Sequence, residues 1–370
     1  MKSIGIILVL LSLCGLHAFS RAQYTKTFVD PARNNRQIQT VIYYPESVAE
    51  PEEPMPYIIF GHGWIMNHSL YSTLTTNLLS LGCIVAFPRT EESLFPDHYE
   101  FALDLSFLEG ALMGENADPL SPLYGKMMPL SLVMGHSMGG GAAVLAAAMD
   151  NGFASLVTFA AAETNVSAIG AAQNVILPSI TFAGSADTVT PPAQNQLPIY
   201  NNLASDYKSY VSINGAGHLN LYNNALIPQI LAPWLEYLKS GEMAWINAFE
   251  GVLEDNSASL SYQIVNNLSV SNEDAVNAPF LVSLTSFPNP FSNHVTIAFS
   301  LPKTMSAELS IHNIKGQKVR SLLAETLSGG DHRLMWDGKN NRGELLAPGI
   351  YLYRLRTGEG VSQGKMLLSY

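Results

Sequence analysis

The stretch LVMGHSMGGG, residues 132–141, decides the fold of this protein. An apolar run (129–134) leads into it, and an alanine-rich run that favours a helix (142–149) follows. A strand, a sharp turn and a helix are the setting in which Gly-x-Ser-x-Gly carries chemistry, because the turn strains the serine backbone and only glycine leaves room on either side. We predict that Ser137 is a nucleophile at the end of a strand. The alternative interpretation is an ordinary Gly/Ser turn.

Short apolar runs alternate with helical patterns over about 220 residues around this stretch. The pattern predicts strands at 40–44, 57–60, 84–87, 129–134, 154–159, 179–183 and 207–213, and helices at 69–81, 101–112, 142–149 and 226–239. Such alternation indicates an α/β fold with a doubly wound, mostly parallel sheet. Ligands of these sheets bind outside the carboxyl ends of the strands, where the loop with Ser137 lies.

A serine hydroxyl needs a base within hydrogen-bond reach and an acid that orients the base. In this kind of fold the order along the chain is serine, acid, histidine, each after a later strand. His218 follows a predicted strand in a glycine-rich loop, and Asp187 ends the strand before it. The alternatives are an exposed loop histidine at 218 and an Asx-turn or helix cap at 187. Asp206 is the rival acid, but it lies in a polar loop between elements.

Acyl transfer also needs donors for a tetrahedral oxyanion. The backbone N–H of Met138, directly after the nucleophile, is one expected donor. The other is expected in the loop GHGW, residues 61–64, after the first central strand; we assign it to the Trp64 N–H, with Gly63 as the near alternative. The Trp64 ring is expected to form a wall of the acyl pocket, unless it is simply a buried turn residue. This chemistry requires no metal and no organic cofactor.

Composition and charge suggest two domains in the chain of 370 residues, which is 47% hydrophobic and 13% charged. Residues 23–283 carry 24 acidic and 7 basic side chains, a net charge of −17, whereas residues 284–370 have a net charge of +4. The change of sign indicates a boundary near residue 283. The acidic part has no basic stripe, which argues against nucleic acid or an anionic membrane as its partner.

Four segments follow from these patterns. Residues 1–22 resemble a secretory signal peptide, with cleavage after Ala22 or, alternatively, after Ala18, and no later run is long enough to span a membrane. An α/β catalytic domain is expected at 23–254, a polar linker with at most one short strand (261–265) at 255–283, and a small antiparallel, Ig-like β-sandwich at 284–370. Cys83 is the one cysteine outside the signal segment and is expected in a buried strand.

Three ordered motifs resemble those of bacterial cutinases and PET-hydrolase-type polyesterases: GHSMGGG at 135–141, GSADTVTP at 184–191 and NGAGH at 214–218. The similarity covers roughly residues 35–240. It implies an α/β-hydrolase with a shallow, open cleft that attacks esters in polymers or lipids. Ser137, Asp187 and His218 would then be the triad, with Trp64 and Met138 as oxyanion donors.

The resemblance also implies a set of substrate contacts: Gly63, Trp64, His136, Met138, Glu163 and Val189. One departure is that the family's Pro-Trp pair beside the cleft has no counterpart, since this chain reads FAAAET at 159–164. An acid in place of an aromatic clamp weakens the case for aromatic polyesters. The family's C-terminal disulfide is missing as well. Chlorophyllase-like and dienelactone-hydrolase-like esterases share the fold and similar motifs, so the substrate stays open.

The tail resembles the C-terminal sorting domain of type IX secretion cargo. It opens with FPNPF at 287–291, contains WDG at 336–338 and GIYLYRL at 349–355, and ends with GKMLL at 364–368. The resemblance implies passage through the type IX machinery, and a secreted or surface-attached protein. The alternative for the tail is a carbohydrate-binding or adhesive sandwich.

We therefore expect an exported serine ester hydrolase that forms an acyl-enzyme, with a polyester, cutin-like or lipid ester as substrate. Two alternatives remain open. One is an esterase for small esters or lipids without activity on solid polymer. The other is a surface binding protein that keeps the fold without catalysis.

Overall fold

The computed structural model describes residues 21–45, 54–149, 152–268, 284–287, 289, 291–301, 303–313, 318–357 and 360–369. The predicted signal segment lies outside them except for Arg21 and Ala22, which begin the first strand. Cleavage after Ala22 would remove these two residues from the strand, whereas cleavage after Ala18 would leave it whole. Residues 269–283 of the predicted linker also lie outside the described part.

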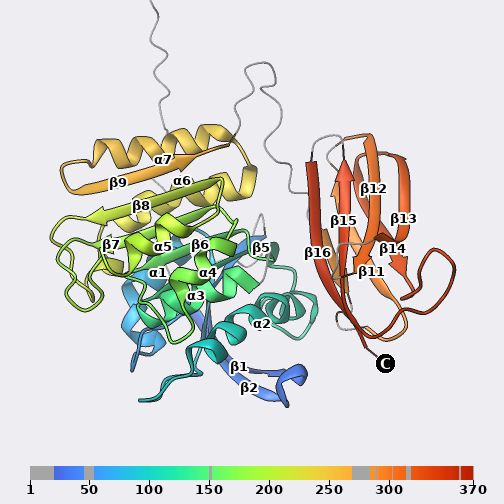
Figure 1. The fold of residues 1–370 in the computed structure, drawn as a ribbon, viewed down its shortest axis with the longest axis horizontal. Helices are drawn as coiled ribbons and strands as arrows, with labels where there is room; N and C mark the ends of the chain where they lie inside the picture. Colours follow the sequence, from blue (N-terminus) through green and yellow to red (C-terminus); the bar gives the residue numbers. More distant parts are fainter. Residues whose placement is uncertain are drawn as a thin grey trace, which may run out of the picture.

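A nine-stranded sheet forms the centre of the first domain (Figure 1), in the order β1-β2-β4-β3-β5-β6-β7-β8-β9. The strands are β1 (Arg21–Asp30), β2 (Arg36–Pro45), β3 (Met55–Gly61), β4 (Ile84–Pro88), β5 (Met127–His136), β6 (Ser155–Phe159), β7 (Ser179–Gly184), β8 (Tyr207–Ile213) and β9 (Leu260–Asn266). Strands β3 to β8 pair in parallel, while β1, β2 and β9 join the two edges by antiparallel pairing. The predicted α/β fold with a mostly parallel sheet is confirmed.

Helices cover both faces of this sheet and bury two separate cores. The helices are α1 (Ser72–Ser80), α2 (His98–Ala117), α3 (Met138–Met149), α4 (Ala168–Ala171), α5 (Gln196–Asn202), α6 (Leu226–Ser240) and α7 (Met243–Asp255). Helices α2, α3 and α5 contribute to one core, and α1, α6 and α7 to the other. Strand β3 is buried along its whole length, as expected for a central strand covered on both faces. Cys83 is buried just before β4.

Several elements differ from the sequence-based expectation. Helix α2 starts three residues earlier than the predicted Phe101, because the Asp97 carboxylate accepts hydrogen bonds from the N–H groups of Tyr99 and Glu100 and caps the helix. At the other end of the domain, α7 and β9 follow α6, and β9 pairs with β8 along seven residues. The sheet therefore continues into the segment that we predicted as a linker.

The tail folds into two antiparallel sheets that form a small sandwich, as predicted (Figure 1). One sheet contains β10 (Leu284–Phe287), β11 (Val295–Leu301) and β14 (Gly330–Trp336); the other contains β12 (Met305–Asn313), β13 (Lys318–Leu327), β15 (Gly349–Thr357) and β16 (Gly360–Leu368). Trp336 is buried in its core, where its ring packs against Phe291 and Tyr351. The sequence predicts strands at 295–299, 307–312, 332–336 and 350–355, which correspond to β11, β12, β14 and β15; strands β10, β13 and β16 were not predicted.

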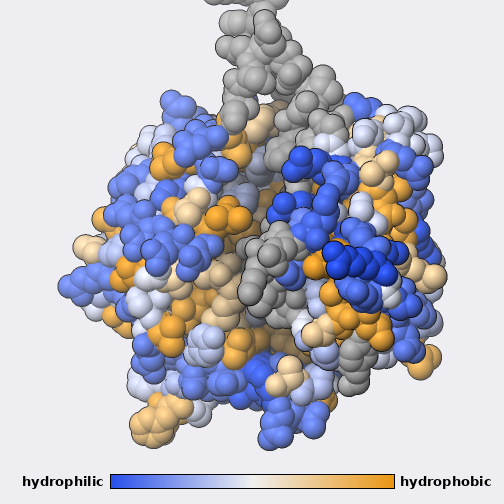
Figure 2. Space-filling model, turned by 45° about the vertical axis from the view of Figure 1, so that its right-hand side comes forward, coloured by the Kyte–Doolittle hydropathy of each residue, from blue (hydrophilic) through white to orange (hydrophobic). Residues whose placement is uncertain are grey.

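The surface carries hydrophobic residues in several separate patches among hydrophilic ones, as the face drawn in Figure 2 shows. No helix in the described ranges is both long enough and apolar enough to cross a membrane.

Candidate active site

Ser137 lies in the sharp turn between β5 and α3. Its φ of +55° is a left-handed conformation that L residues rarely adopt. Three backbone hydrogen bonds hold it: the Ser137 N–H donates to the Phe159 carbonyl (3.0 Å), and the Ser137 carbonyl accepts from the N–H groups of Gly141 (3.1 Å) and Ala162 (2.9 Å). The turn is therefore anchored to the end of β6 and to the first turn of α3, and the strain is carried by fixed neighbours.

The glycines of the motif allow backbone to lie against backbone. A Cβ on Gly139 would lie 2.2 Å from the carbonyl carbon of Gly61 in β3, and a Cβ on Gly135 would lie 2.1 Å from the Gly139 oxygen. Neither neighbour is a side chain that could move aside. Because the first turn of α3 rests directly on β3, the loop after β3 is held beside Ser137.

The three predicted reactive side chains meet at this edge of the sheet. The His218 Nε2 lies 2.9 Å from the Ser137 Oγ, and the His218 Nδ1 lies 2.8 Å from the Asp187 Oδ2. Ser137 keeps 8% of its surface exposed, and Asp187 keeps 4%. The rival Asp206 precedes β8 and therefore lies at the opposite edge of the parallel sheet. The arrangement allows a proton to pass from Ser137 to His218 while Asp187 holds the imidazole.

The loop after β7 donates hydrogen bonds that orient the Asp187 carboxylate. Its Oδ1 accepts from the N–H groups of Val189 (2.8 Å) and Thr190 (3.0 Å), and its Oδ2 accepts from the Thr190 hydroxyl (2.9 Å). Burial by itself raises the pKa of Asp187, but the hydrogen bonds from His218 and Thr190 outweigh it, so the pKa is lower than usual. Asp187 is accordingly ionised at neutral pH.

Thr190 is a site residue that the sequence reasoning did not single out. Its hydroxyl also lies 3.1 Å from the Ala160 carbonyl oxygen and 3.2 Å from the His218 Nδ1, and it accepts from the Gln196 Nε2 at 3.2 Å. It thus links the acid loop to the end of β6 and to α5. Its place three residues after the acid, in an Asx-turn pattern, is the signal that could have drawn attention to it.

His136 lies beneath the site, where its hydrogen bonds define its protonation. Burial, with the nearby His218, lowers the pKa of His136 to about 3, so the ring is neutral at neutral pH. Its Nε2 lies 3.0 Å from the His218 carbonyl oxygen, which can only accept, so Nε2 carries the proton. Its Nδ1 then accepts from the Tyr71 hydroxyl (3.0 Å), and that hydroxyl accepts from the Gly63 N–H (2.8 Å).

This chain of bonds corrects two predicted substrate contacts. His136 has no exposed surface, and both of its ring nitrogens are bonded within the protein. Gly63 is buried, and its N–H is engaged by Tyr71. Neither residue lines the cleft. Together with Tyr71, they connect the loop after β3 to the backbone of His218.

The geometry narrows the choice of oxyanion donors. Because the Gly63 N–H donates to Tyr71, Trp64 is the better candidate of the two in this loop. Met138 is the first residue of α3, so its N–H is among those that have no partner inside the helix. The helix dipole also favours negative charge at this end. The Trp64 side chain is 55% exposed, which excludes the interpretation as a buried turn residue.

A cleft of about 510 Å³ opens beside Ser137. Its walls contain four predicted contacts, Trp64, Met138, Glu163 and Val189, and a further group that sequence reasoning missed: Leu94, Phe95, Pro96, His98, Ala162, Asn165 and Thr190. Several of these lie in the loop between β4 and α2. That loop follows a strand at its carboxyl end, so the general rule for ligand sites in such sheets could have indicated it.

Polar residues that line the cleft form hydrogen bonds with neighbouring residues of the protein. The Glu163 carboxylate accepts from the Ile169 N–H (2.9 Å), and the Asn165 N–H donates to the His98 Nδ1 (3.2 Å). Burial lowers the pKa of His98. Within the described residues, no group of three or more His, Cys, Asp or Glu side chains lies close enough to hold a metal ion.

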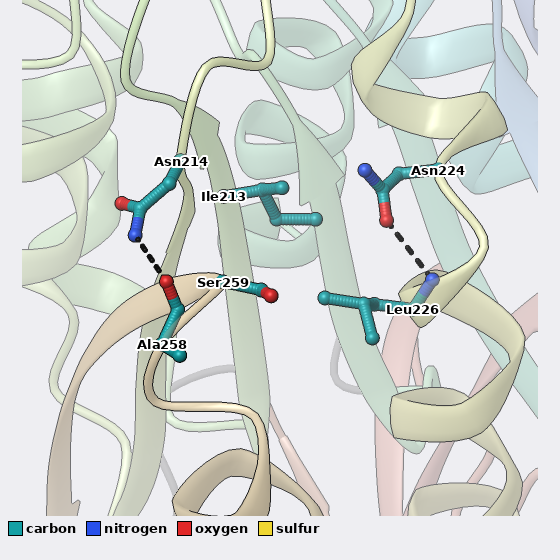
Figure 3. A pocket seen from close by; sticks show the side chains of 6 residues that line it. All are labelled: Ile213, Asn214, Asn224, Leu226, Ala258 and Ser259. Atoms are coloured by element: carbon teal, nitrogen blue, oxygen red, sulfur yellow. Dashed lines mark hydrogen bonds between the residues drawn. The ribbon is translucent and has the colours of Figure 1, made fainter.

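A second hollow lies between the end of β8, the start of β9 and the start of α6 (Figure 3). The Asn214 amide donates to the Ala258 carbonyl (3.3 Å), and the Asn224 side chain accepts from the Leu226 N–H (2.9 Å). Ile213 and Ser259 complete its walls, and no titratable side chain lines it. The hollow therefore offers no candidate chemistry.

The α/β-hydrolase class is defined by three residues on loops of a doubly wound sheet. A serine lies in a nucleophile turn, and a buried acid and then a histidine follow later strands along the chain. Residues 35–243 match the family model described as PET hydrolase-like, which is more than half of the chain. The protein belongs to the PET hydrolase-like family, and is a hydrolase of the cutinase or PET-hydrolase type. Residues 291–360 match a model described as the FlgD Ig-like domain, which agrees with the sandwich fold of the tail. None of the curated proteins matches the chain significantly.

Proposed function

We propose that this protein is a serine carboxylic ester hydrolase that works through an acyl-enzyme, and that its substrate is a polyester. The observation that carries the proposal is the pair of contacts made by His218, at 2.9 Å to the Ser137 Oγ and 2.8 Å to the Asp187 Oδ2. Family membership supports the reaction class, and the apolar walls of the open cleft support a substrate of low polarity.

The steps follow from general acid–base chemistry. Ser137 attacks the ester carbonyl carbon while His218 takes the hydroxyl proton, and Asp187 stabilises the imidazolium. The backbone N–H groups of Trp64 and Met138 stabilise the oxyanion. The tetrahedral intermediate collapses, His218 returns the proton to the leaving alkoxide, and an acyl group remains on Ser137. Water, deprotonated by His218, then releases the acid and restores the serine.

A comparison of soluble and solid esters tests this proposal. We expect turnover of p-nitrophenyl acetate and butyrate, and release of soluble acid and alcohol from an amorphous polyester film. Ser137→Ala should remove both activities. Turnover of the soluble esters alone would identify the alternative, a small-ester or lipid esterase. If neither is hydrolysed by folded protein, a binding protein without catalysis is the better description.

We also propose that the protein is exported, with residues 1–22 as the signal and the tail as the address for the type IX machinery. The tail's resemblance to sorting domains supports this, because its terminal stretch 364–368 matches their signature. An Ig-like sandwich is compatible with the role. Expression in a bacterium that has this route should place the full chain outside the cell. A chain without residues 284–370 should stay in the periplasm, and its appearance in the medium would contradict the proposal.

A further inference from the structure

The loop between β4 and α2 carries two large apolar side chains at the mouth of the cleft. Leu94 is 62% exposed and Phe95 is 93% exposed, and both line the same cleft as Ser137. The Trp64 ring (55% exposed) and the Val189 side chain (66% exposed) line it too. In Figure 1 the teal segment that leads into α2 lies at the lower edge of the domain. Single exposed apolar residues are common, but here four of them line one cleft, and we call them the apolar rim.

The tip of this loop is fixed by hydrogen bonds. The Trp64 indole N–H donates to the Leu94 carbonyl at 3.1 Å, and the Phe95 N–H donates to the Ser93 hydroxyl at 3.2 Å. The loop base is tied by the Glu91 carboxylate, which accepts from the Asp97 N–H (2.6 Å). Because the backbone around Leu94 and Phe95 is bonded at both sides, the loop itself needs little further ordering when a ligand binds.

The same carboxylate connects the loop to the sheet. Glu91 pairs with Arg36 in β2 at 2.8 Å, and Arg36 in turn pairs with the buried Asp104 of α2 at 2.8 Å. Glu91 itself has a φ of +60°. A strained residue held by an ion-pair network indicates that the conformation of the loop is specified by the fold.

The exposed Phe95 side chain does not stabilise the folded domain through burial. The side chain belongs to neither core of the domain and leaves nearly all of its surface in water. Such surface contributes nothing to folding through burial, whereas it would be covered if an apolar ligand lay across the cleft. The loop after β6, where the resemblance would place a Pro-Trp pair, offers Glu163 instead. Among the residues that line the cleft, Trp64 and Phe95 carry the large apolar aromatic rings.

We infer that Trp64, Leu94, Phe95 and Val189 form an apolar rim that binds the surface of a water-insoluble, uncharged polyester and brings its chain to Ser137. Charge favours this partner over an anionic lipid membrane. Residues 23–283 carry a net charge of −17, which anionic lipid surfaces repel and an uncharged polymer does not. The inference rests on the proposed function, because it names the surface through which that reaction would reach a solid substrate.

Adsorption to film, measured in the Ser137→Ala background, separates binding from catalysis. We expect Phe95→Ser to weaken adsorption to polyester film about tenfold, as loss of one buried aromatic side chain implies. Leu120→Ser is the matched control: Leu120 is 92% exposed, but it lies between α2 and β5, at the opposite edge of the sheet from Ser137. That variant should adsorb like the parent. Equal adsorption of all three proteins, or equal loss in both variants, would overturn the inference.

Two further readouts separate the possible failures. In the active enzyme, Phe95→Ser should lower release from film about tenfold more than it lowers turnover of p-nitrophenyl acetate. If the parent protein does not hydrolyse p-nitrophenyl acetate, the proposed function is refuted. The adsorption data would still show whether the apolar rim binds polyester. Vesicles of phosphatidylcholine with and without phosphatidylglycerol provide the lipid arm. Binding to either vesicle as tight as to film would assign the rim to a membrane and overturn the inference.

Discussion

At the residue scale, the reactivity of the site depends on the hydrogen bonds that loop residues donate to the Asp187 carboxylate. The Asp187 carboxylate has three donors from its own loop besides His218, which keep its pKa low despite burial. A folded-state pKa below the unfolded one adds stability above the unfolded pKa, and that stability is lost as the pH falls through the folded pKa. Thr190 supplies two of those donors.

Replacing Thr190 by valine keeps the shape of the side chain and the backbone N–H but removes the hydroxyl. The pKa of Asp187 should rise, because one hydrogen bond to its charged form is lost. We expect kcat to fall about tenfold, which corresponds to roughly 1.4 kcal/mol. The acid limb of the pH–rate profile should move to higher pH, because Asp187 becomes protonated at a higher pH once this hydrogen bond is lost. Thr190→Ser should restore both, and an unshifted profile in Thr190→Val would speak against this role.

Residues in local motifs could be predicted from sequence, and those brought in by tertiary contacts could not. Ser137, Asp187 and His218 each stand in a turn motif after an apolar strand, so their order and setting were visible. Tyr71 lies 65 residues before its partner His136 and occupies an unremarkable helical stretch. No local pattern distinguishes such a tyrosine from a core residue, so only the fold shows its contact.

At the element scale, the loops after β3, β5 and β8 are linked beneath the cleft. The link runs from the Gly63 N–H through the Tyr71 hydroxyl and the His136 ring to the His218 carbonyl. It therefore spans the expected oxyanion loop and the loop of the base. Tyr222 packs edge-on against the same His136 ring, with centroids 4.7 Å apart.

Tyr71→Phe should leave the Gly63 N–H and the His136 Nδ1 buried without a partner, at a cost of about 1–3 kcal/mol of unfolding free energy. We expect kcat to fall more than KM rises, because the link positions groups that act in the transition state. Tyr222→Phe keeps its ring beside His136 and should change neither quantity. The effects of Tyr71→Phe and His136→Gln should not add, since both break the same link. Additive effects would indicate two unconnected structural roles.

The same substitution, glycine to alanine, should have opposite effects on stability in the nucleophile turn and in α2. Gly139→Ala forces a Cβ to within 2.2 Å of the β3 backbone, so we expect loss of folded, soluble protein. Gly114→Ala, in α2, meets nothing within 4 Å and should stabilise the protein by about 0.5–1 kcal/mol through helix propensity. Denaturant unfolding measures both. A well-folded Gly139→Ala protein would contradict the close approach of β3 and α3.

Central elements were predicted more fully than edge elements, for a physical reason. The fully buried β3 is a continuous apolar run, and its position follows from the sequence. Strand β9 lies at the sheet edge and buries only Leu260, so the sequence indicated at most a short strand (261–265) inside a polar linker. In α7 only Ile246, Phe249 and Leu253 are buried, a stripe too narrow to stand out.

At the scale of the whole molecule, each folded part closes its own core. The two cores of the α/β domain draw on residues 28–268, and the core of the sandwich draws on residues 284–368. The change of net charge from −17 to +4 falls between them. The predicted boundary near residue 283 lies between these two ranges, and the sheet of the first domain reaches further along the chain than expected.

A protein that ends at residue 268 should therefore keep its fold and its soluble-ester turnover. We expect its thermal unfolding midpoint to match the corresponding transition of the full chain, because no buried residue of its two cores is removed. A protein that ends at residue 255 lacks β9 and should unfold at a lower temperature, since β8 then loses its antiparallel neighbour. Equal midpoints for both truncations would show that β9 is dispensable.

The central claim is that Ser137 is made nucleophilic by His218. A fluorophosphonate, followed by peptide mass spectrometry, tests it most directly, because the reagent reports the reactivity of one oxygen atom and needs no knowledge of the natural substrate. We predict a single adduct on Ser137 in the parent protein and labelling at least about a hundredfold slower in His218→Ala. Folded parent protein that leaves Ser137 unmodified, or that labels equally fast without the imidazole, would contradict the account.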